Sequence, residues 1–220
     1  MRKVKFALII ILGFTLMSCQ SKLDLKSDKH LNEVFTDREI AEIEKMISYV
    51  DDMVVEQTGN RDVNEGYHQF LDKQLQSIED GSSYLMPFEE EEKYRFLESL
   101  DSTVFNEFWY MGNHIRYAKY KDSVYQDLDN YKYLDIKYRS KYRDYLEKIG
   151  ENDAYYQSVK ETFDLAGGLA PDIVVRFLNM QSEFDFTIPK NRLWATVFLL
   201  AIEESNDKKM ERYLNQKNQN

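Results

Sequence analysis

Aromatic and basic side chains are concentrated in one part of the sequence. Eleven of the sixteen tyrosines lie between Tyr110 and Tyr156. Aromatic rings interleaved with Arg and Lys can stack on sugar rings or bases and bind their polar groups. The stretch 131–138 lacks helical spacing, so we expect its three tyrosines to be exposed. The candidate partner-binding residues are these tyrosines, two neighbouring lysines and one histidine: Tyr131, Tyr133, Tyr138, Lys132, Lys137 and His114.

The alternative for this window is a structural role. Tyr142 and Tyr145 recur at helical spacing, which is typical of core residues whose hydroxyls reach the rim of the core. His114 follows Gly112-Asn113, and an ordinary polar or partly buried role is the alternative for it as well.

Residues for catalysis or metal binding do not occur in a recognisable pattern. A zinc site needs three or four convergent ligands, and His30, His68 and His114 lack that spacing. The sequence contains no glycine-rich phosphate loop and no G-x-S-x-G motif. We therefore expect no catalytic residue, no metal and no cofactor. A carboxylate pair of the glycosidase type stays open, because 39 acidic residues allow many pairings.

The chain begins with a basic head and an apolar run that ends at a cysteine. Arg2, Lys3 and Lys5 precede the run from 6 to 17, and Leu16-Met17-Ser18-Cys19 follows. This order is typical of a secretory signal. The apolar run of about twelve residues falls short of the roughly 20 that a membrane span needs. The closing residues resemble the lipobox of bacterial lipoproteins.

The resemblance implies a signal peptide at 1–18 and lipidation of Cys19, with a diacylglyceryl group on the thiol and an acyl group such as palmitate on the new amine. Two or three acyl chains on one residue anchor a protein stably to a membrane. Gln20 stands where the family places Asp for retention in the inner membrane, which implies an outer-membrane, cell-envelope location. The alternative is an uncleaved anchor helix with an incidental cysteine. Cys19 is the only cysteine, so an intrachain disulfide is excluded.

The length and charge of the mature chain fit one acidic domain. Removal of residues 1–18 leaves 202 residues, enough for a single core. Because Arg2, Lys3 and Lys5 are the charged residues of that segment, the net charge moves from −10 to −13. This charge disfavours nucleic acid as a partner. We expect a flexible tether at 19–30, a globular domain at 31–214 and a disordered tail at 215–220.

Helical spacing and capping residues recur along the domain. Thr36 and Glu39 form a capping box, and Gly59 supplies a stop. Ser102 is expected to cap a helix that continues through Met111. The run Glu89–Glu92 is interpreted as a solvated first helical turn.

The most apolar segment, Leu193 to Ile202, is too short to span a bilayer and is apolar on all sides. We expect it to be the central helix. Few glycines and prolines argue against strands and turns. The sequence therefore predicts a single all-α domain of seven to eight short helices around this buried C-terminal helix.

Three short elements, Ile149-Gly150, Gly167-Gly168 with Pro171, and Asp185-Phe186, resemble those of small helical lipoproteins of unknown activity. This resemblance implies no reaction. On function we expect a membrane-anchored envelope protein that acts as a non-enzymatic interaction or accessory module, with a protein or a glycan as partner. The alternative is a periplasmic hydrolase that acts on cell-wall or other glycans.

Overall fold

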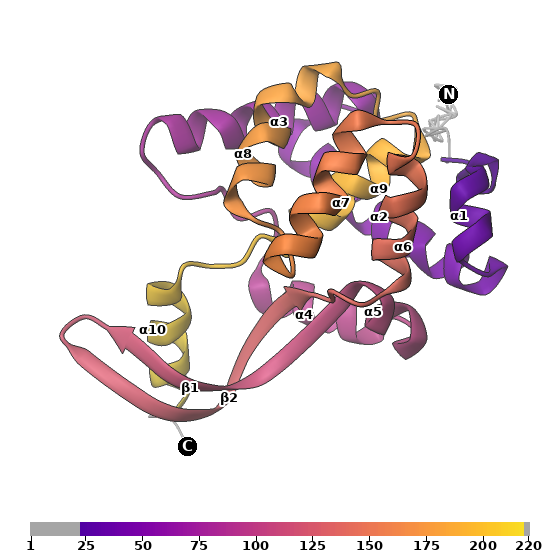
Figure 1. The fold of residues 1–220 in the computed structure, drawn as a ribbon. Coiled ribbons are helices and arrows are strands. Elements are labelled where there is room, and N and C mark those ends of the chain that lie inside the picture. Colours follow the sequence, from indigo (N-terminus) through magenta and orange to yellow (C-terminus); the bar gives the residue numbers. More distant parts are fainter. Residues whose placement is uncertain (1–22, 218–220) are drawn as a thin grey trace, which may run out of the picture.

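The computed structural model describes residues 23–217, a mostly helical region with one two-stranded sheet (Figure 1). The elements follow in this order: η1 (Leu25–Ser27), α1 (Lys29–Val34), α2 (Asp37–Thr58), α3 (Val63–Glu79), α4 (Glu90–Ser99), α5 (Ser102–Phe108), β1 (Trp109–Tyr120), β2 (Ser123–Ile136), α6 (Lys141–Gly150), α7 (Ala154–Ala166), α8 (Pro171–Met180), η2 (Gln181–Glu183), α9 (Pro189–Ala201) and α10 (Asn206–Lys217).

The expectation of an all-α fold is wrong for residues 109–136, which form an antiparallel hairpin. Its strands are rich in tyrosine and β-branched residues, which favour a pleated surface. The turn at Lys121-Asp122 contains no glycine, although Lys121 has a φ of 53°, so the usual turn signal is missing from the sequence. Because β1 begins at Trp109, the helix predicted to reach Met111 ends at Phe108. The residue that caps this helix is Asp101, not Ser102 as predicted.

The predicted helix ends in the remaining body are confirmed. Thr36 and Glu39 make both hydrogen bonds of a capping box at the start of α2, and Gly59 ends that helix in the left-handed region. Ser140 caps α6 and Gly167 ends α7. These local interactions satisfy backbone groups that a helix end leaves unpaired.

The central helix is α9, as predicted. Every residue from Leu193 to Leu200 is buried, and α9 packs against α2. Trp194 and Phe198 both make edge-on contacts with Phe177 of α8, at ring-centroid distances of 5.6 and 5.2 Å. Burial of large aromatic side chains of this kind is a main source of core stability.

The body begins earlier than predicted. Leu25 of η1 and Leu31 of α1 are buried in the core, and Asp28 caps α1 and accepts a hydrogen bond from Tyr145 at 2.7 Å. A flexible tether at 19–30 is therefore wrong from Leu25 onward, because Leu25 and Leu31 bury apolar surface in the core. The predicted signal peptide, Cys19 and residues 20–22 lie outside the described residues.

The end of the chain also differs from the prediction. Helix α10 continues to Lys217, so residues 215–217 of the predicted disordered tail are helical, and 218–220 lie outside the described residues. From 23 to 217, the structure has no helix that is both long and apolar enough to cross a membrane.

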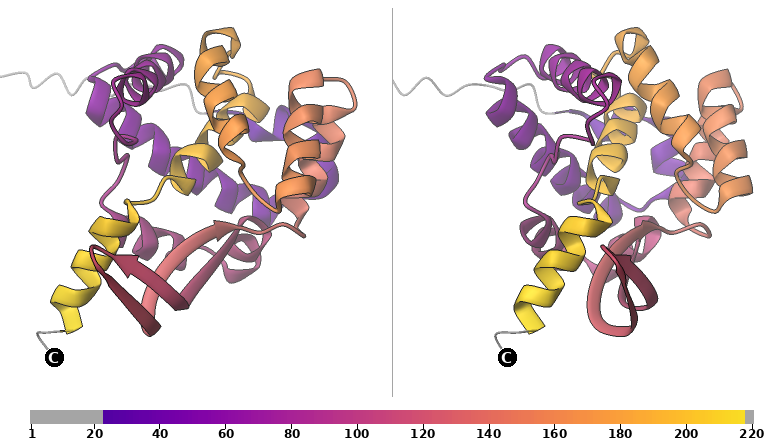
Figure 2. Two further views of the ribbon diagram at one scale, coloured as in Figure 1. Left: turned by 60° about the vertical axis from the view of Figure 1, so that its left-hand side comes forward. Right: turned by 90° about the vertical axis from the view of Figure 1, so that its left-hand side faces the viewer.

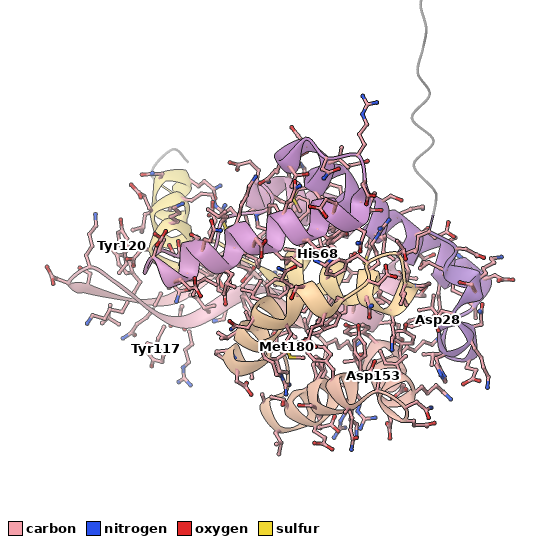
Figure 3. All side chains as sticks on the ribbon, turned by 90° about the horizontal axis from the view of Figure 1, so that it is seen from above. Asp28, His68, Tyr117, Tyr120, Asp153 and Met180 are labelled. Carbon is pink, nitrogen blue, oxygen red and sulfur yellow. The ribbon has the colours of Figure 1, made fainter. Side chains whose placement is uncertain are left out.

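The hairpin extends away from the helical body, and α10 lies along it in both views of Figure 2. We call β1, β2 and α10 together the hairpin arm. A small apolar cluster, separate from the main core, joins these elements and contains Leu128, Tyr131 and Met210. In Figure 3, Asp28 and Tyr120 lie at opposite ends of the molecule, so the arm is far from the N-terminal helices.

Candidate functional site

A cleft of about 440 Å³ lies within the hairpin arm. We call it the hairpin cleft. Its strand side is formed by Ile115, Tyr117, Ala118, Lys119, Tyr131 and Tyr133. Its other side is formed by the link after α9 and by α10, through Glu203, Asn206, Lys209 and Met210. The volume falls in the ordinary range of small-ligand sites.

Two of the three predicted tyrosines, Tyr131 and Tyr133, line this cleft, but they are less exposed than expected. Tyr131 is 6% exposed, so its predicted exposure is wrong. Its ring packs against Tyr213 of α10 at a centroid distance of 5.6 Å, because the strand alternation turns it toward that helix. Tyr133 is half-buried, and its ring lies directly over Gly112 on the neighbouring strand, where an added Cβ would stand 2.2 Å from ring atoms.

The other predicted residues lie elsewhere. Tyr138 is exposed and borders a different cleft, of about 510 Å³, at the start of α6. Lys132 forms an ion pair with Glu98 at 2.7 Å. His114, on β1, lies 3.0 Å from a carboxylate oxygen of Asp129. Lys137 is half-buried beyond β2. The structure therefore brings together Tyr131 and Tyr133 but does not bring the six candidates into one site.

Sequence reasoning missed Tyr117, which is also in the cleft. It is 59% exposed, and the guanidinium of Arg116 lies 5.6 Å from the centre of its ring. The interleaving of aromatic and basic residues was the relevant signal. The position of Tyr117 opposite α10 follows from the strand register, which the sequence did not reveal.

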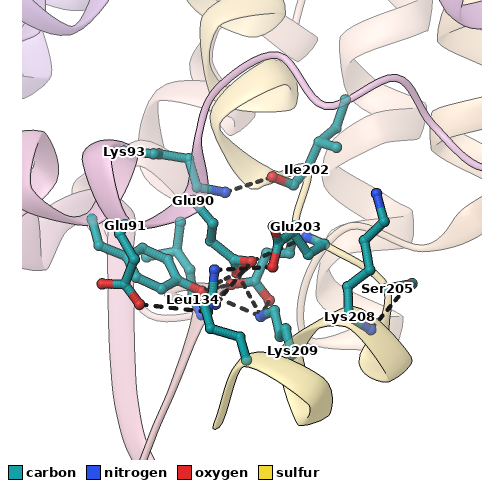
Figure 4. Close-up of polar contacts among 12 residues, drawn as sticks. Glu90, Glu91, Lys93, Leu134, Ile202, Glu203, Ser205, Lys208 and Lys209 are labelled. Atoms are coloured by element: carbon teal, nitrogen blue, oxygen red, sulfur yellow. Dashed lines mark hydrogen bonds and ion pairs between the residues drawn. The ribbon is translucent and has the colours of Figure 1, made fainter. Parts of the chain in front are cut away.

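The floor of the hairpin cleft belongs to a largely buried set of charges, the charge cluster, which joins α4, the link after α9 and α10 (Figure 4). It consists of Glu90, Glu203, Glu204, Lys93, Lys209 and Arg212. Arg212 also pairs with the half-buried Glu91 at 3.6 Å. The interpretation of Glu89–Glu92 as a solvated turn is wrong for Glu90, whose side chain is fully buried. Its ion-pair partners, Lys209 and Arg212, come from more than a hundred residues further along the chain.

Lys209 is the centre of the charge cluster. Its ammonium nitrogen lies 2.9 Å from Glu90 Oε1, 2.7 Å from Glu203 Oε2 and 3.2 Å from the hydroxyl of Tyr94. These three contacts match its three N–H donors. Buried charges of this kind persist only when paired and hydrogen-bonded.

Tyr94 and the hairpin backbone complete the coordination of the two glutamates. The Tyr94 hydroxyl lies 2.5 Å from an oxygen of Glu90 and of Glu203. Having one proton, it donates to one of them at a time. The backbone N–H of Leu134 also donates to Glu203, at 2.7 Å. The hairpin is thus tied by a backbone hydrogen bond to the same carboxylate that α10 pairs with.

The second half of the charge cluster involves Arg212 and Lys93. Arg212 contacts Glu90 at 3.3 Å and Glu204 at 2.9 Å. The ammonium of Lys93 donates to the backbone carbonyl of Ile202, the residue at which α9 ends. Every element that meets at the base of the arm therefore contributes to one polar network.

Burial and pairing shift the pKa values of this network. Burial raises the pKa of the Glu90 carboxyl, but the Tyr94 hydroxyl and the Lys209 ammonium more than compensate, so the net shift is downward. Burial lowers the pKa of Lys93 to about 8, against the opposing effect of Glu203 and Glu90. Burial raises the pKa of Glu204, and Arg212 offsets this only in part. Glu90 is held ionised, which does not suit a general acid.

The described residues, 23–217, contain no group of three or more His, Cys, Asp or Glu side chains that could hold a metal ion. The glutamates that converge below the cleft bind Lys209 and Arg212 instead. The arrangement therefore offers a structured floor of paired charges below an aromatic rim.

No family model, curated protein or solved structure matches this chain.

Proposed function

We propose that the protein is a lipid-anchored component of the bacterial cell envelope that acts as a non-enzymatic interaction module and captures its partner in the hairpin cleft. The anchor rests on the lipobox-like residues Leu16-Met17-Ser18-Cys19. Capture rests on the geometry of the arm. Gln20 after the cysteine supports a location at the outer membrane.

One observation carries the choice of binding over catalysis: the charged groups of the cleft floor are occupied by one another, whereas the rim is open. Lys209 has three internal partners, and Glu203 accepts hydrogen bonds on both oxygens. Tyr117 is exposed at the rim, where Arg116 lies 5.6 Å from the centre of its ring. A floor of this kind supports shape and orientation and has no free acid or base for proton transfer.

The position of the arm suits capture away from a membrane. The buried Leu25 comes six positions after Cys19, and six residues of fully extended chain span about 20 Å. An anchor at Cys19 would therefore keep the N-terminal helices close to the bilayer. Because Asp28 and Tyr120 lie at opposite ends of the molecule (Figure 3), the arm would point away from it.

Glycan hydrolysis gains no support from the hairpin cleft. A glycosidase uses two carboxyl groups on opposite sides of the bond that it breaks. Glu203 is the one carboxylate among the described residues that line this cleft, and it is paired with Lys209.

The anchor is tested by replacing Cys19 with Ala and separating membrane from soluble fractions at high salt. We expect Cys19→Ala to leave the membrane fraction, whereas the matched control Ser21→Ala, which keeps the lipobox-like residues intact, stays with it. In a density gradient the wild type should travel with outer membranes. Membrane association of Cys19→Ala at high salt would contradict the proposal.

The capture surface is tested by placing a photo-crosslinking side chain at residue 117 or at residue 165 in the anchored protein. Both positions are exposed, Leu165 at 90% on the body and Tyr117 on the arm. We expect adducts from 117 and none from 165 after illumination of intact cells. Equal adduct yields, or adducts from 165 alone, would contradict an arm-based interaction module.

A further inference from the structure

We infer that the hairpin cleft binds a hydroxyl-rich ligand, namely a saccharide segment of roughly one or two sugar rings. The inference rests on the proposed function, because it takes the hairpin cleft as the capture site. It adds the chemical class of the ligand.

The paired charges of the floor argue against a ligand cation. Glu203 and Lys209, which both line the cleft, pair with each other at 2.7 Å. A ligand cation would have to displace Lys209 from its carboxylates, which leaves a buried charge unpaired and is costly. The third charged residue of the lining, Lys119, is exposed, and its ammonium can donate to a ligand oxygen.

The polar groups of the lining argue against a purely apolar ligand. Glu203 Oε2 accepts from Lys209 alone among the described residues, so one lone pair remains for a donor. The side chains of Asn206 and Lys119, which also line the cleft, are exposed and can donate hydrogen bonds to a ligand. An apolar ligand would remove these groups from water without compensation. Hydroxyl groups, which both donate and accept, satisfy all three.

The aromatic side chains supply the remaining surface. Tyr117 is mostly exposed and presents a ring on which the C–H faces of a sugar can stack. Tyr133 is held in place over Gly112 and against Tyr110, whose ring centroid lies 6.2 Å away. Rings that are fixed before binding lose little conformational entropy when a ligand arrives. The combination of fixed rings and polar groups fits a sugar.

The test uses the full-length lipidated protein in lipid nanodiscs and isothermal titration with neutral oligosaccharides: malto-, cello- and manno-oligosaccharides and N-acetylchito-oligosaccharides. We expect at least one series to bind. Tyr117→Ala should weaken that binding by about tenfold, which corresponds to one lost ring contact. Tyr117→Phe, which keeps the ring, should retain most of the affinity.

The matched control is Tyr138→Ala, which removes an exposed tyrosine outside the hairpin cleft and should leave the affinity unchanged. Equal weakening by Tyr117→Ala and Tyr138→Ala would overturn the inference, as would the absence of binding in every series. Tighter binding of an amine-bearing oligosaccharide than of its neutral counterpart would overturn the argument from charge.

The outcomes separate this inference from the proposed function. If no sugar binds but residue 117 still crosslinks to a protein in cells, the cleft is a capture site for another class of ligand and only the inference fails. If a sugar binds and the titrated oligosaccharide is recovered in shorter pieces, the non-enzymatic function fails.

Discussion

The helical body and the hairpin arm are stabilised by different kinds of interaction. In the body, α9 is buried on all sides by apolar residues, with Trp194 and Phe198 packed on Phe177. In the arm, the apolar cluster around Leu128, Tyr131 and Met210 is small and separate from the main core. At the base of the arm, Trp109, Leu134 and Ile136 join the main core, and the charge cluster adds ion pairs there.

The difference predicts that the body resists local opening and that the arm opens more easily. Large apolar burial makes a region open only by global unfolding, whereas a region with few apolar contacts opens locally at lower free energy. Binding elements are commonly drawn from the second kind of region. The hairpin cleft lies between the hairpin, the link after α9 and α10, so the body serves as its support. The following substitutions test this comparison, beginning with the largest expected effect.

Replacing Trp194 with Ala should destabilise the whole molecule. Removal of a fully buried aromatic side chain leaves a cavity and costs about 4 kcal/mol. Urea unfolding followed by far-UV circular dichroism measures this loss. The matched control Leu165→Ala removes an apolar side chain that is 90% exposed and should change stability by less than about 0.5 kcal/mol. Similar losses for both variants would show that α9 is not the centre of the core.

Replacing Lys209 with Met should cost about 3 kcal/mol, because it leaves Glu90 and Glu203 buried without their shared cation. The matched control is Lys208→Met, on the exposed side of the same helix, with an expected change below about 0.5 kcal/mol. Both are measured by urea unfolding. If the two variants unfold at the same urea concentration, the charge cluster does not hold the arm.

Replacing Lys93 with Met should remove a pH dependence. The pKa of Lys93 is lowered by burial from 10.5 to about 8, so between these values the unfolded chain binds more protons than the folded chain. Stability therefore rises with pH in this window. From about pH 8 to about pH 10 the wild type should gain about 2 kcal/mol relative to Lys93→Met. If the unfolding free energies of the two proteins changed with pH in parallel, Lys93 would not be the source of this pH dependence.

Replacing Gly112 with Ala should cost about 1 kcal/mol, the smallest of these effects. The new Cβ would meet the ring of Tyr133, which must move away from the hairpin cleft. Gly168→Ala is the matched control, because its Cβ would stand 3.6 Å from the nearest atom and should be tolerated. The double variant Gly112→Ala/Tyr133→Ala should lose less stability than the sum of the losses of the two single variants. Full additivity would show that the two residues do not interact.

The sequence predicted the body well because its signals are local. A capping box joins Thr36 to Glu39 over three residues, and the burial of α9 follows from an apolar run in one segment. The tether was predicted to extend too far because Leu25 and Leu31 stand among charged residues, so no clear apolar pattern marks this short segment. The lipid anchor at Cys19 stays a prediction.

The arm was predicted poorly because its determinants are not local. The hairpin turn at Lys121 has the backbone conformation of a glycine or asparagine without either residue. Glu90 is buried because Lys209 reaches it from a segment more than a hundred residues away, and nothing in a run of glutamates marks which one is buried. Tyr131 and Tyr133 were correctly placed in one window, but their partner α10 and the inward orientation of Tyr131 depend on the strand register.

Amide hydrogen exchange of the full-length protein, followed by mass spectrometry, tests the separation of arm and body most directly. The account predicts that amides of β1, β2 and α10 exchange through an opening of lower free energy than those of α2 and α9. It also predicts that Lys209→Met speeds exchange in the arm and leaves α2 and α9 unchanged. A single opening free energy shared by both regions, lowered equally by Lys209→Met, would contradict it.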